Sequence, residues 1–144
     1  MKILFLGDVV GVSGRSMILK NLLSKIKDEK IDFVVVNGEN AADSGVGITK
    51  EICKDFFNCG VDVVTTGNHV WDQKEIMSHI EKENRLLRPI NLYEPSPGKG
   101  FGIFTAKNGG RVGVLNLMGN VFMKKCEDVF EAAEKFIKKY KLKE

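Results

Sequence analysis

Three short apolar runs, rich in β-branched residues, mark the first half of the chain at residues 3–6, 33–36 and 61–64. Runs of this kind are typical of strands buried on both faces of a parallel sheet, because neither face has to present polar side chains to water. The pattern therefore predicts three parallel strands that are covered on both sides.

The two connections between these runs carry apolar residues at helical spacing. The positions are Leu19, Leu22, Leu23 and Ile26 in the first connection and Ile52, Cys53 and Phe56 in the second. Residues three and four apart share one face of a helix, so each set is expected to face the core. Thr49 precedes the second set as a plausible N-cap, whose side-chain oxygen accepts a hydrogen bond from a free backbone N–H. This part of the chain predicts a β-α-β-α-β unit.

The pattern changes after the third run. A third helix is expected over about residues 72–82, with Ile76, Met77 and Ile80 on one face. All three prolines fall within residues 88–98. Proline lacks the backbone N–H that helices and central strands use, so this stretch is expected to be an irregular loop.

The last third of the chain predicts a hairpin and a helix. Residues 101–106 and 111–117 flank an Asn-Gly-Gly sequence at 108–110, which allows the tight turn that joins two antiparallel strands. The inward positions of a last amphipathic helix are expected to be Phe130, Ala133, Ile137 and Tyr140. The fold class is therefore α/β, with a parallel sheet, a hairpin and a terminal helix.

Composition and charge narrow the class of protein. The chain has 144 residues, 43% hydrophobic and 28% charged, which suits a single globular domain over residues 1–144. Its 22 basic and 19 acidic residues are interspersed and give a net charge of +3, too weak a bias for nucleic-acid binding. No apolar run is long enough for a membrane span or a secretion signal, so a cytoplasmic protein is expected.

The cysteines do not indicate a metal site. Cys53, Cys59 and Cys126 form no Cys-x-x-Cys pair, and none stands beside a histidine at zinc-ligand spacing. We therefore expect them to be reduced packing residues.

Polar side chains with ligand chemistry follow each predicted strand. The candidate site residues are Asp8 after the first strand, Glu39 and Asn40 after the second, and Asn68 and His69 after the third. The carboxyl ends of adjacent parallel strands lie at one edge of a sheet, about 4.8 Å apart, so these side chains are expected to meet. Carboxylate oxygens, amide oxygens and an imidazole suit Mn²⁺, Fe or Mg²⁺, and a carboxylate can bridge two ions.

Each of these residues, taken alone, also fits a purely structural role. Asp8 fits a turn or a helix cap, Asn40 and Asn68 fit turns, and His69 fits a structural histidine. Glu39 is harder to account for without a cation, because a carboxylate that follows a buried strand is costly to bury unpaired. A nucleotide-binding loop fits poorly, since residues 7–14 match neither Gly-x-Gly-x-x-Gly nor a Walker loop, although their glycines could open the first helix against an anion.

Seven motifs are spread over the chain. They are Gly7-Asp8-Val9-Val10-Gly11, Asn37-Gly38-Glu39-Asn40-Ala41-Ala42, Gly45-Val46-Gly47-Ile48-Thr49, Gly67-Asn68-His69-Val70-Trp71-Asp72, Arg88-Pro89-Ile90-Asn91, Pro97-Gly98-Lys99-Gly100 and Asn116-Leu117-Met118-Gly119. Together they resemble the YmdB-type bacterial metallophosphoesterases, a subfamily of the calcineurin-like superfamily. The chain differs from the common form of that superfamily in having Asp8-Val9-Val10 in place of Asp-x-His, and Glu39 in place of a bridging aspartate.

The resemblance implies a calcineurin-like sandwich of αββα layers with two divalent metal ions, iron or manganese, with magnesium as the alternative. It assigns Asp8 and Asn40 to the first ion, Glu39 to both ions, Asn68 to the second ion, and His69 to the role of general acid. The implied reaction is hydrolysis of 2′,3′-cyclic nucleotides. The implied partner is a small phosphodiester or nucleotide, without a stable nucleic-acid complex or a membrane, and self-association is left open.

Two further residues carry expectations. Arg88 and the glycine-proline loop after it are expected to contact substrate, or the arginine to form a surface ion pair. His79, among charged residues of the third predicted helix, is expected at the surface.

The resemblance also contains a departure that bears on function. Family members continue past this chain and take three more metal-ligand histidines from their second half, whereas only His69 and His79 occur here. The chain is therefore expected to be the amino-terminal portion of such a protein, as a truncated chain, a fragmentary gene product or an incompletely represented chain, with an incomplete dinuclear site. Two functions stay open, a metal-dependent phosphodiesterase and a non-catalytic module that binds phosphate or nucleotide without turnover.

Overall fold

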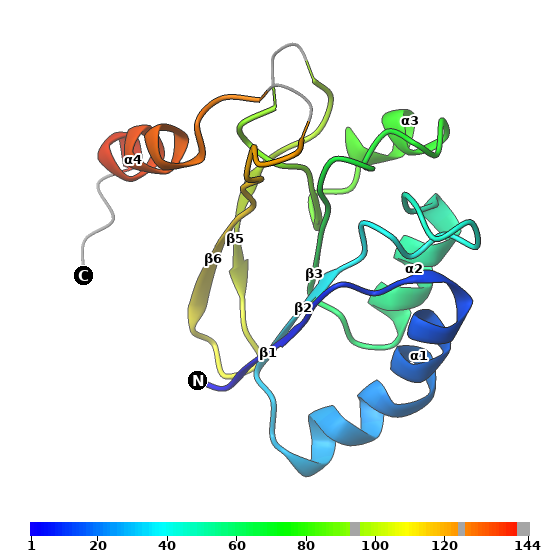
Figure 1. The fold of residues 1–144 in the computed structure, drawn as a ribbon. Helices are drawn as coiled ribbons and strands as arrows, with labels where there is room; N and C mark the ends of the chain where they lie inside the picture. The colour runs from blue at the N-terminus through cyan, green and yellow to red at the C-terminus, as the bar shows by residue number, and fades with distance from the viewer. Residues whose placement is uncertain (93–95, 124–125, 141–144) are drawn as a thin grey trace.

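A parallel sheet lies at the centre of the fold, with helices on one face and a hairpin on the other (Figure 1). The computed structural model describes residues 1–92, 96–123 and 126–140. The strands, in spatial order, are β1 (Ile3–Leu6), β2 (Phe33–Asn37), β3 (Val63–Thr65) and β4 (Leu86–Leu87). All neighbours pair in parallel, so the carboxyl ends of the strands lie at one edge. The predicted α/β class is confirmed.

Three helices follow the first three strands on the same face of the sheet. They are α1 (Gly11–Asp28), α2 (Lys50–Asn58) and α3 (Ile76–Ile80). In α2 the three predicted core residues are buried, and Thr49 Oγ1 accepts a hydrogen bond from Ile52 N at 3.2 Å. The predicted N-cap is therefore confirmed.

The structure shortens the third helix and adds a strand. Backbone N–H groups of Asp72, Ile76 and Met77 donate to carbonyls three residues earlier, so the segment before α3 forms turns rather than the predicted helical start. The two-residue strand β4 follows α3 and was not predicted, because a pair of leucines is too short to show a period. The third strand also starts later than predicted, at Val63, and ends at Thr65.

The sheet separates two apolar cores. Successive side chains of a strand point to opposite faces, so Val34 and Val36 of β2 pack under the helices while Phe33 and Val35 pack under the hairpin. All four are buried, with at most 5% of their surface exposed. The prediction of a strand covered on both faces is thus confirmed for β2.

The predicted hairpin is confirmed, and a helix lies beyond it. Strands β5 (Phe101–Thr105) and β6 (Arg111–Leu115) pair antiparallel around a turn in which Gly109 has a φ of +82°. Helix α4 (Val129–Tyr140) packs on the outer side of the hairpin, since the ring of Phe101 lies 4.6 Å from that of Phe136, centroid to centroid. The layers are therefore helices, sheet, hairpin and helix, as Figure 1 shows.

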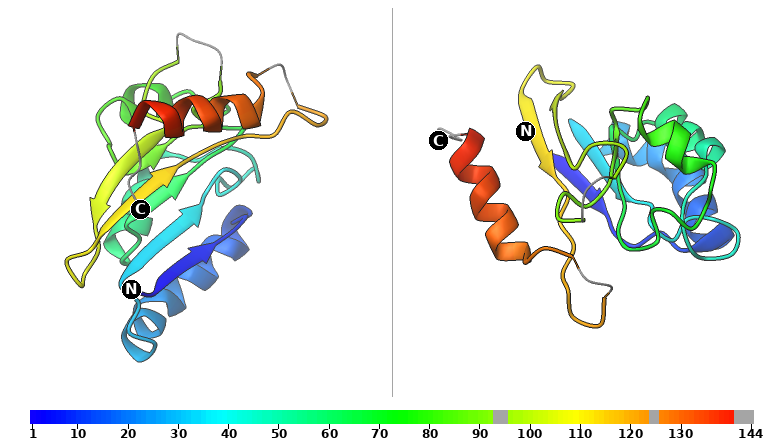
Figure 2. Two further views of the ribbon diagram at one scale, coloured as in Figure 1. Left: turned by 90° about the vertical axis from the view of Figure 1, so that its left-hand side faces the viewer. Right: turned by 90° about the horizontal axis from the view of Figure 1, so that it is seen from above.

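Strand β1 differs from the prediction of burial on both faces. Ile3 and Phe5 are 51% and 60% exposed, although they belong to a wholly apolar strand. β1 is the terminal strand of the sheet, and the hairpin covers β2 to β4 rather than β1 (Figure 2). Position in the sheet, rather than composition, decides this exposure.

The predicted inward face of helix α1 is confirmed for Leu22 and Ile26 and wrong for Leu19 and Leu23. Ile18 and Leu22 are buried and Ile26 packs partly against the core, whereas Leu19 and Leu23 are exposed. Apolar side chains lie on more than one side of this helix, and the side that contains Ile18 packs against the sheet.

Helix α4 was predicted with the wrong inward face as well. Ala132 and Phe136 are buried, whereas Phe130 and Ile137 are 77% and 51% exposed. Tyr140 is also largely exposed, although its ring packs against that of Phe136. The aromatic contact with β5 sets the rotation of the helix.

The three cysteines are packing residues. Cys53, Cys59 and Cys126 are free and buried, as predicted, and burial raises the pKa of the Cys59 thiol. Within the described residues, no helix combines the length and apolar character needed to cross a membrane.

A buried asparagine joins the hairpin to the sheet. Asn116 follows β6, and its side-chain Nδ2 donates to Thr66 O at 2.9 Å and to Leu87 O at 3.0 Å, next to the ends of β3 and β4. Its backbone N–H also donates to Gly100 O at 2.9 Å. This residue therefore holds the two layers together at the carboxyl edge of the sheet.

Replacing that side chain should destabilise the fold. Asn116→Ala leaves two buried carbonyls without this donor, and the free energy of unfolding should fall by about 1–3 kcal/mol. Urea denaturation measures the change, with the exposed Asn120→Ala as the matched control. Equal stability of the two variants would contradict the bridging role of Asn116.

Candidate functional site

The loops after β1 and β2 are joined at the carboxyl edge of the sheet. Asn40 Nδ2 donates to Asp8 Oδ1 at 3.0 Å across 32 positions of sequence. The backbones are joined as well, because Val9 N donates to Asn37 O at 3.0 Å and Gly11 N to Asn40 O at 2.9 Å. Asp8 and Asn40 therefore meet, as their places after neighbouring strands suggested.

The loop after β2 also contacts the loop after β3. His69 N donates to Glu39 Oε1 at 3.1 Å. The Glu39 carboxylate lies directly against Gly67, where a Cβ atom would overlap both carboxylate oxygens. Any side chain at position 67 would therefore displace the Glu39 carboxylate from this place.

The His69 ring has a carboxylate partner that sequence reasoning did not single out. Its Nδ1 lies 2.6 Å from Asp72 Oδ2, and both side chains are partly exposed to solvent. A carboxylate on one ring nitrogen fixes the tautomer and orientation of a histidine, which leaves the other nitrogen for chemistry. The sequence signal for this pair was the spacing of three residues between His69 and Asp72. Residues at this spacing in a turn lie on the same side of it.

Asn68 is the fifth candidate and is less connected. It lies between Gly67 and His69 and is half-buried. Among the residues that the structure describes, no hydrogen bond joins its side chain to the other four candidates. The structure thus brings Asp8 to Asn40 and Glu39 to His69 through hydrogen bonds, and places Asn68 only by its position in the chain.

The loop that carries Glu39 and Asn40 is braced from α1. Arg15 donates from one guanidinium nitrogen to Ala41 O at 2.5 Å and from another to Asp43 Oδ1 at 2.6 Å. Gly38 N donates to Thr65 O at 3.0 Å, which ties the same loop to β3. These bonds fix the backbone from which the two candidate ligands project.

The donor set suits hard metal ions in its chemistry. Asp8, Glu39, Asn40 and Asn68 offer carboxylate and amide oxygens, which are ligands suited to Mn²⁺, Fe²⁺ or Mg²⁺. Within residues 1–92, 96–123 and 126–140, however, no three His, Cys, Asp or Glu side chains are grouped to hold an ion. The chemistry of these side chains therefore fits such ions, although the described residues contain no cluster of three such groups.

Arg88 is a loop-organising residue rather than a surface group. It is 5% exposed, and its guanidinium donates to the carbonyls of Pro89, Ser96 and Pro97 at 2.9–3.2 Å. The surface position in the ion-pair alternative is therefore wrong, because the polar backbone of the proline-rich loop needs a buried donor, whereas contact of Arg88 with substrate stays a prediction.

His79 is also less exposed than expected. Its Nε2 is buried and has no hydrogen-bond partner among the described residues, and burial lowers the pKa of the imidazole. The ring lines a cavity of 160 Å³ with Lys50, Phe57 and Arg85, and none of the five candidate residues lines that cavity. His79 therefore lies outside the candidate site.

Comparison with known proteins identifies relatives about twice as long. A 2′,3′-cyclic-nucleotide 2′-phosphodiesterase from Bacillus subtilis strain 168 is 43% identical over 138 residues, which are 95% of this chain and 51% of the relative. The chain also superposes with a TM-score of 0.86 on the crystal structure of a hypothetical protein from Thermus thermophilus, at 36% identity. A novel phosphatase from Mycoplasma pneumoniae gives the same TM-score at 31% identity.

The matches cover nearly the whole of this chain and one part of each relative. The chain is covered to 96% in both structural comparisons, against 53% of the Thermus protein and 51% of the Mycoplasma protein. It thus spans about half the length of these relatives. A family model described as YmdB-like protein matches residues 4–144. With its sequence, its fold and the motifs at its strand ends in agreement, the chain belongs to the YmdB-like protein family.

Proposed function

We propose that this chain carries the histidine acid and part of the metal ligands of a phosphodiesterase that hydrolyses 2′,3′-cyclic nucleotides. The observation that carries the proposal is the meeting of Asp8 with Asn40 and of Glu39 with His69 at one edge of the sheet. The name of the Bacillus subtilis relative supports the substrate class. Because that relative is about twice as long as this chain, we assign its activity to this chain as a proposal.

The proposed metal ligands are Asp8 and Asn40 for one divalent ion, Glu39 for both ions, and Asn68 for the other. When bound, two such ions neutralise phosphate charge and supply a nucleophilic hydroxide at neutral pH. Iron or manganese suits the mixed carboxylate and amide donors, with magnesium as the alternative. The Glu39 carboxylate lies beside Gly67, between the loops after β2 and β3, and this place supports the bridging role.

His69 is proposed as the general acid. Hydrolysis forms one bond between phosphorus and a water-derived oxygen and breaks one bond between phosphorus and a ribose oxygen, which leaves needing a proton. The imidazolium of His69 donates that proton, a step typically worth 10²–10⁴-fold in rate. Asp72 positions the ring through Nδ1, so that Nε2 is the nitrogen that faces the departing oxygen.

A second function is favoured by one observation. The described residues contain no group of three or more His, Cys, Asp or Glu side chains placed for a metal ion. With few protein ligands, metal affinity would be low, and the chain would bind phosphate or nucleotide without turning it over.

Turnover and calorimetry separate the two functions. The family-length version consists of residues 1–144 followed by the part of the Bacillus subtilis relative outside the match. It should hydrolyse 2′,3′-cyclic AMP with Mn²⁺ or Fe²⁺ and stop when EDTA removes the metal. The binding function instead expects nucleotide binding in a calorimetric titration of the 144-residue chain with Mn²⁺, with no turnover by either protein.

Removing the proposed acid should lower the rate of the family-length version. His69→Ala should reduce kcat by about 10²–10⁴-fold, because the ribose oxygen then leaves without a proton donor. Asp72→Asn should cost less, about 10–100-fold, because the ring stays but loses its orienting carboxylate. His79→Ala is the matched control, and its rate should be unchanged. If His69→Ala keeps the full rate, the assignment of the acid is wrong.

Adding a single methyl group at Gly67 should disturb the site without removing a ligand. Gly67→Ala forces the Glu39 carboxylate to move, and misplacement by about 1 Å can cost 10²-fold in rate. Gly119→Ala is the control, since a Cβ there meets no atom within 4 Å. Steady-state kinetics at several Mn²⁺ concentrations should show a raised metal requirement for Gly67→Ala alone. Identical metal dependence of the two variants would argue against Glu39 as a ligand.

A further inference from the structure

The His69–Asp72 pair depends on its turn for its orientation. The two side chains are 35% and 42% exposed, and an exposed ion pair contributes little to its own geometry because water competes for both partners. Both residues belong to one turn, in which Asp72 N donates to His69 O at 3.1 Å. Whatever fixes the backbone of this turn therefore also fixes the direction of the His69 ring.

A loop after β2 lies against this turn. It consists of residues 42–47, and we call it the glycine loop. Gly47 is buried there with a φ of +79°, and a Cβ atom at this position would lie 3.3 Å from His69 O and 3.4 Å from Asp72 Cβ. It would also lie 2.9 Å from Gln73 Cγ. The backbone of Gly47 thus approaches the two residues whose side chains form the pair.

The side chain of Gln73 joins the turn to the glycine loop. Gln73 directly follows Asp72 and is half-buried. Its Nε2 donates to Val46 O at 3.0 Å and lies 3.5 Å from Ser44 Oγ. The turn is therefore held on one side by close packing on Gly47 and on another by a hydrogen bond from Gln73.

The glycine loop is itself closed by backbone hydrogen bonds. Ala42 N donates to Gly47 O at 2.9 Å, and Gly45 N donates to Ala42 O at 2.8 Å. Gly45 has the same φ of +79° as Gly47, a backbone conformation that glycine adopts without strain. These bonds give the loop a fixed shape against which the turn can rest.

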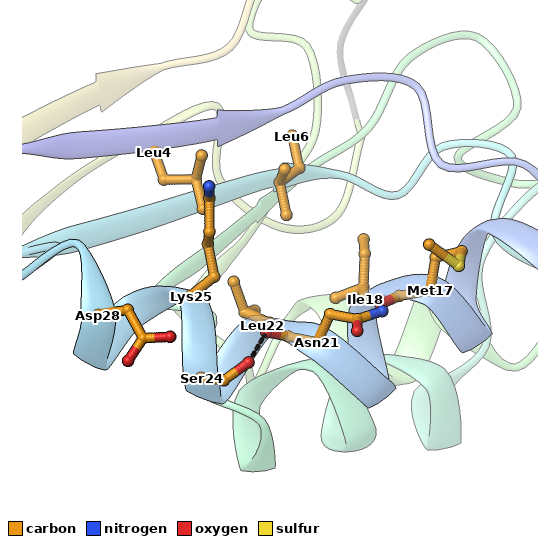
Figure 3. A pocket seen from close by; sticks show the side chains of 9 residues that line it. All are labelled: Leu4, Leu6, Met17, Ile18, Asn21, Leu22, Ser24, Lys25 and Asp28. Carbon is orange, nitrogen blue, oxygen red and sulfur yellow. Dashed lines mark hydrogen bonds between the residues drawn. The ribbon is translucent and has the colours of Figure 1, made fainter.

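Helix α1 anchors the residue that precedes the glycine loop. Arg15 of this helix donates to Ala41 O at 2.5 Å. The helix is in turn held on the sheet, because Ile18 and Leu22 are buried, and Figure 3 shows both side chains directed toward β1. The glycine loop therefore transmits to the His69 turn a position that is set by the packing of α1 on the sheet.

We propose that the glycine loop is the positioning element of the His69–Asp72 pair. Gly47 and Gln73 are its positioning residues, and they hold the turn so that Nδ1 of the ring stays on the Asp72 carboxylate and Nε2 stays free for proton donation. The consequence for proton donation rests on the proposed function, whereas the orientation of the ring does not.

Nitrogen NMR of the His69 ring tests the orientation without metal or substrate. An ionised carboxylate only accepts hydrogen bonds, so a neutral ring bonded to Asp72 carries its proton on Nδ1. The 144-residue chain has only two histidines, and a His79→Ala variant identifies the signals of His69. At a pH where the ring is neutral, the unsubstituted chain should show the Nδ1–H tautomer.

Two variants should loosen this orientation. Gln73→Met keeps the length of the side chain but removes the donor to Val46 O, and Gly47→Ala forces the turn away from the loop. In both, the Nε2–H tautomer should appear beside the Nδ1–H form, because Nδ1 no longer stays on its partner. If Gly47→Ala does not fold, Gln73→Met decides alone, and an unchanged tautomer in Gln73→Met would overturn the proposal.

Each variant has a matched control. Lys74→Met makes the same replacement at the exposed next position. Gly109→Ala imposes the same backbone cost, since Gly109 has a φ of +82°, but a Cβ atom there meets nothing within 4 Å. Both controls should keep the Nδ1–H tautomer of the unsubstituted chain, and loss of that tautomer in either control would overturn the proposal.

Kinetics of the family-length version test the consequence for proton donation. The ribose oxygen of 2′,3′-cyclic AMP needs a proton as it leaves, whereas the nitrophenolate of a bis-nitrophenyl phosphodiester leaves without one. Gln73→Met and Gly47→Ala should lower kcat for the cyclic nucleotide by about tenfold, the lower end of the effect of losing an orienting partner. KM, the Mn²⁺ requirement and kcat for the nitrophenyl diester should be unchanged.

The two substrates separate positioning from general damage. Equal losses of kcat on both substrates would overturn the proposal, and so would an unchanged kcat on the cyclic nucleotide. His69→Ala shows separately whether the proposed function holds. If His69→Ala keeps the full rate on the cyclic nucleotide, the proposed function fails, and the tautomer of Gln73→Met then decides whether the glycine loop positions the ring.

Discussion

Parallel pairing of β1, β2 and β3 is the constraint on which the rest of the structure depends. It places the carboxyl ends of three strands at one edge, and each end is followed by a loop that carries polar side chains. Groups separated by about 30 positions in sequence thereby come within hydrogen-bond distance, side chain to side chain for Asn40 and Asp8 and backbone N–H to side chain for His69 and Glu39. Burial of β2 under two apolar layers makes this register costly to change, because a slip of one residue would exchange its two faces.

Contacts to the backbone hold the loops at the carboxyl edge of the sheet, where the candidate residues lie. Asn116 spans the ends of β3 and β4, Arg15 holds the loop after β2, and Gly67 allows Glu39 to lie against the loop after β3. The candidate ligands thus project from loops whose backbones are fixed by other residues. A binding site needs supporting residues of this kind, because they hold its polar side chains in one geometry.

Much of the fold could be predicted because its signals are local. The apolar runs, the N-cap at Thr49 and the Asn-Gly-Gly turn each act within a few residues, and all three appear in the structure. The buried faces of α1 and α4 could not be predicted in the same way. Each helix carries apolar side chains on more than one side, and the choice between them depends on the neighbouring strands. The strand β4 has only two residues, which is too few for periodicity.

Apart from β4, the sequence by itself determined the order of strands and helices. It also determined the polar residues that follow the first three strands, because both depend on residues close together in the chain. It also pointed to Asp8, Glu39, Asn40, Asn68 and His69 as one group. Tertiary structure alone decided that Asp72 holds the His69 ring, that Glu39 rests on Gly67, and that β1 presents an open apolar edge. Those features depend on which segments lie beside one another, and burial or exposure of a residue is set by its neighbours in space.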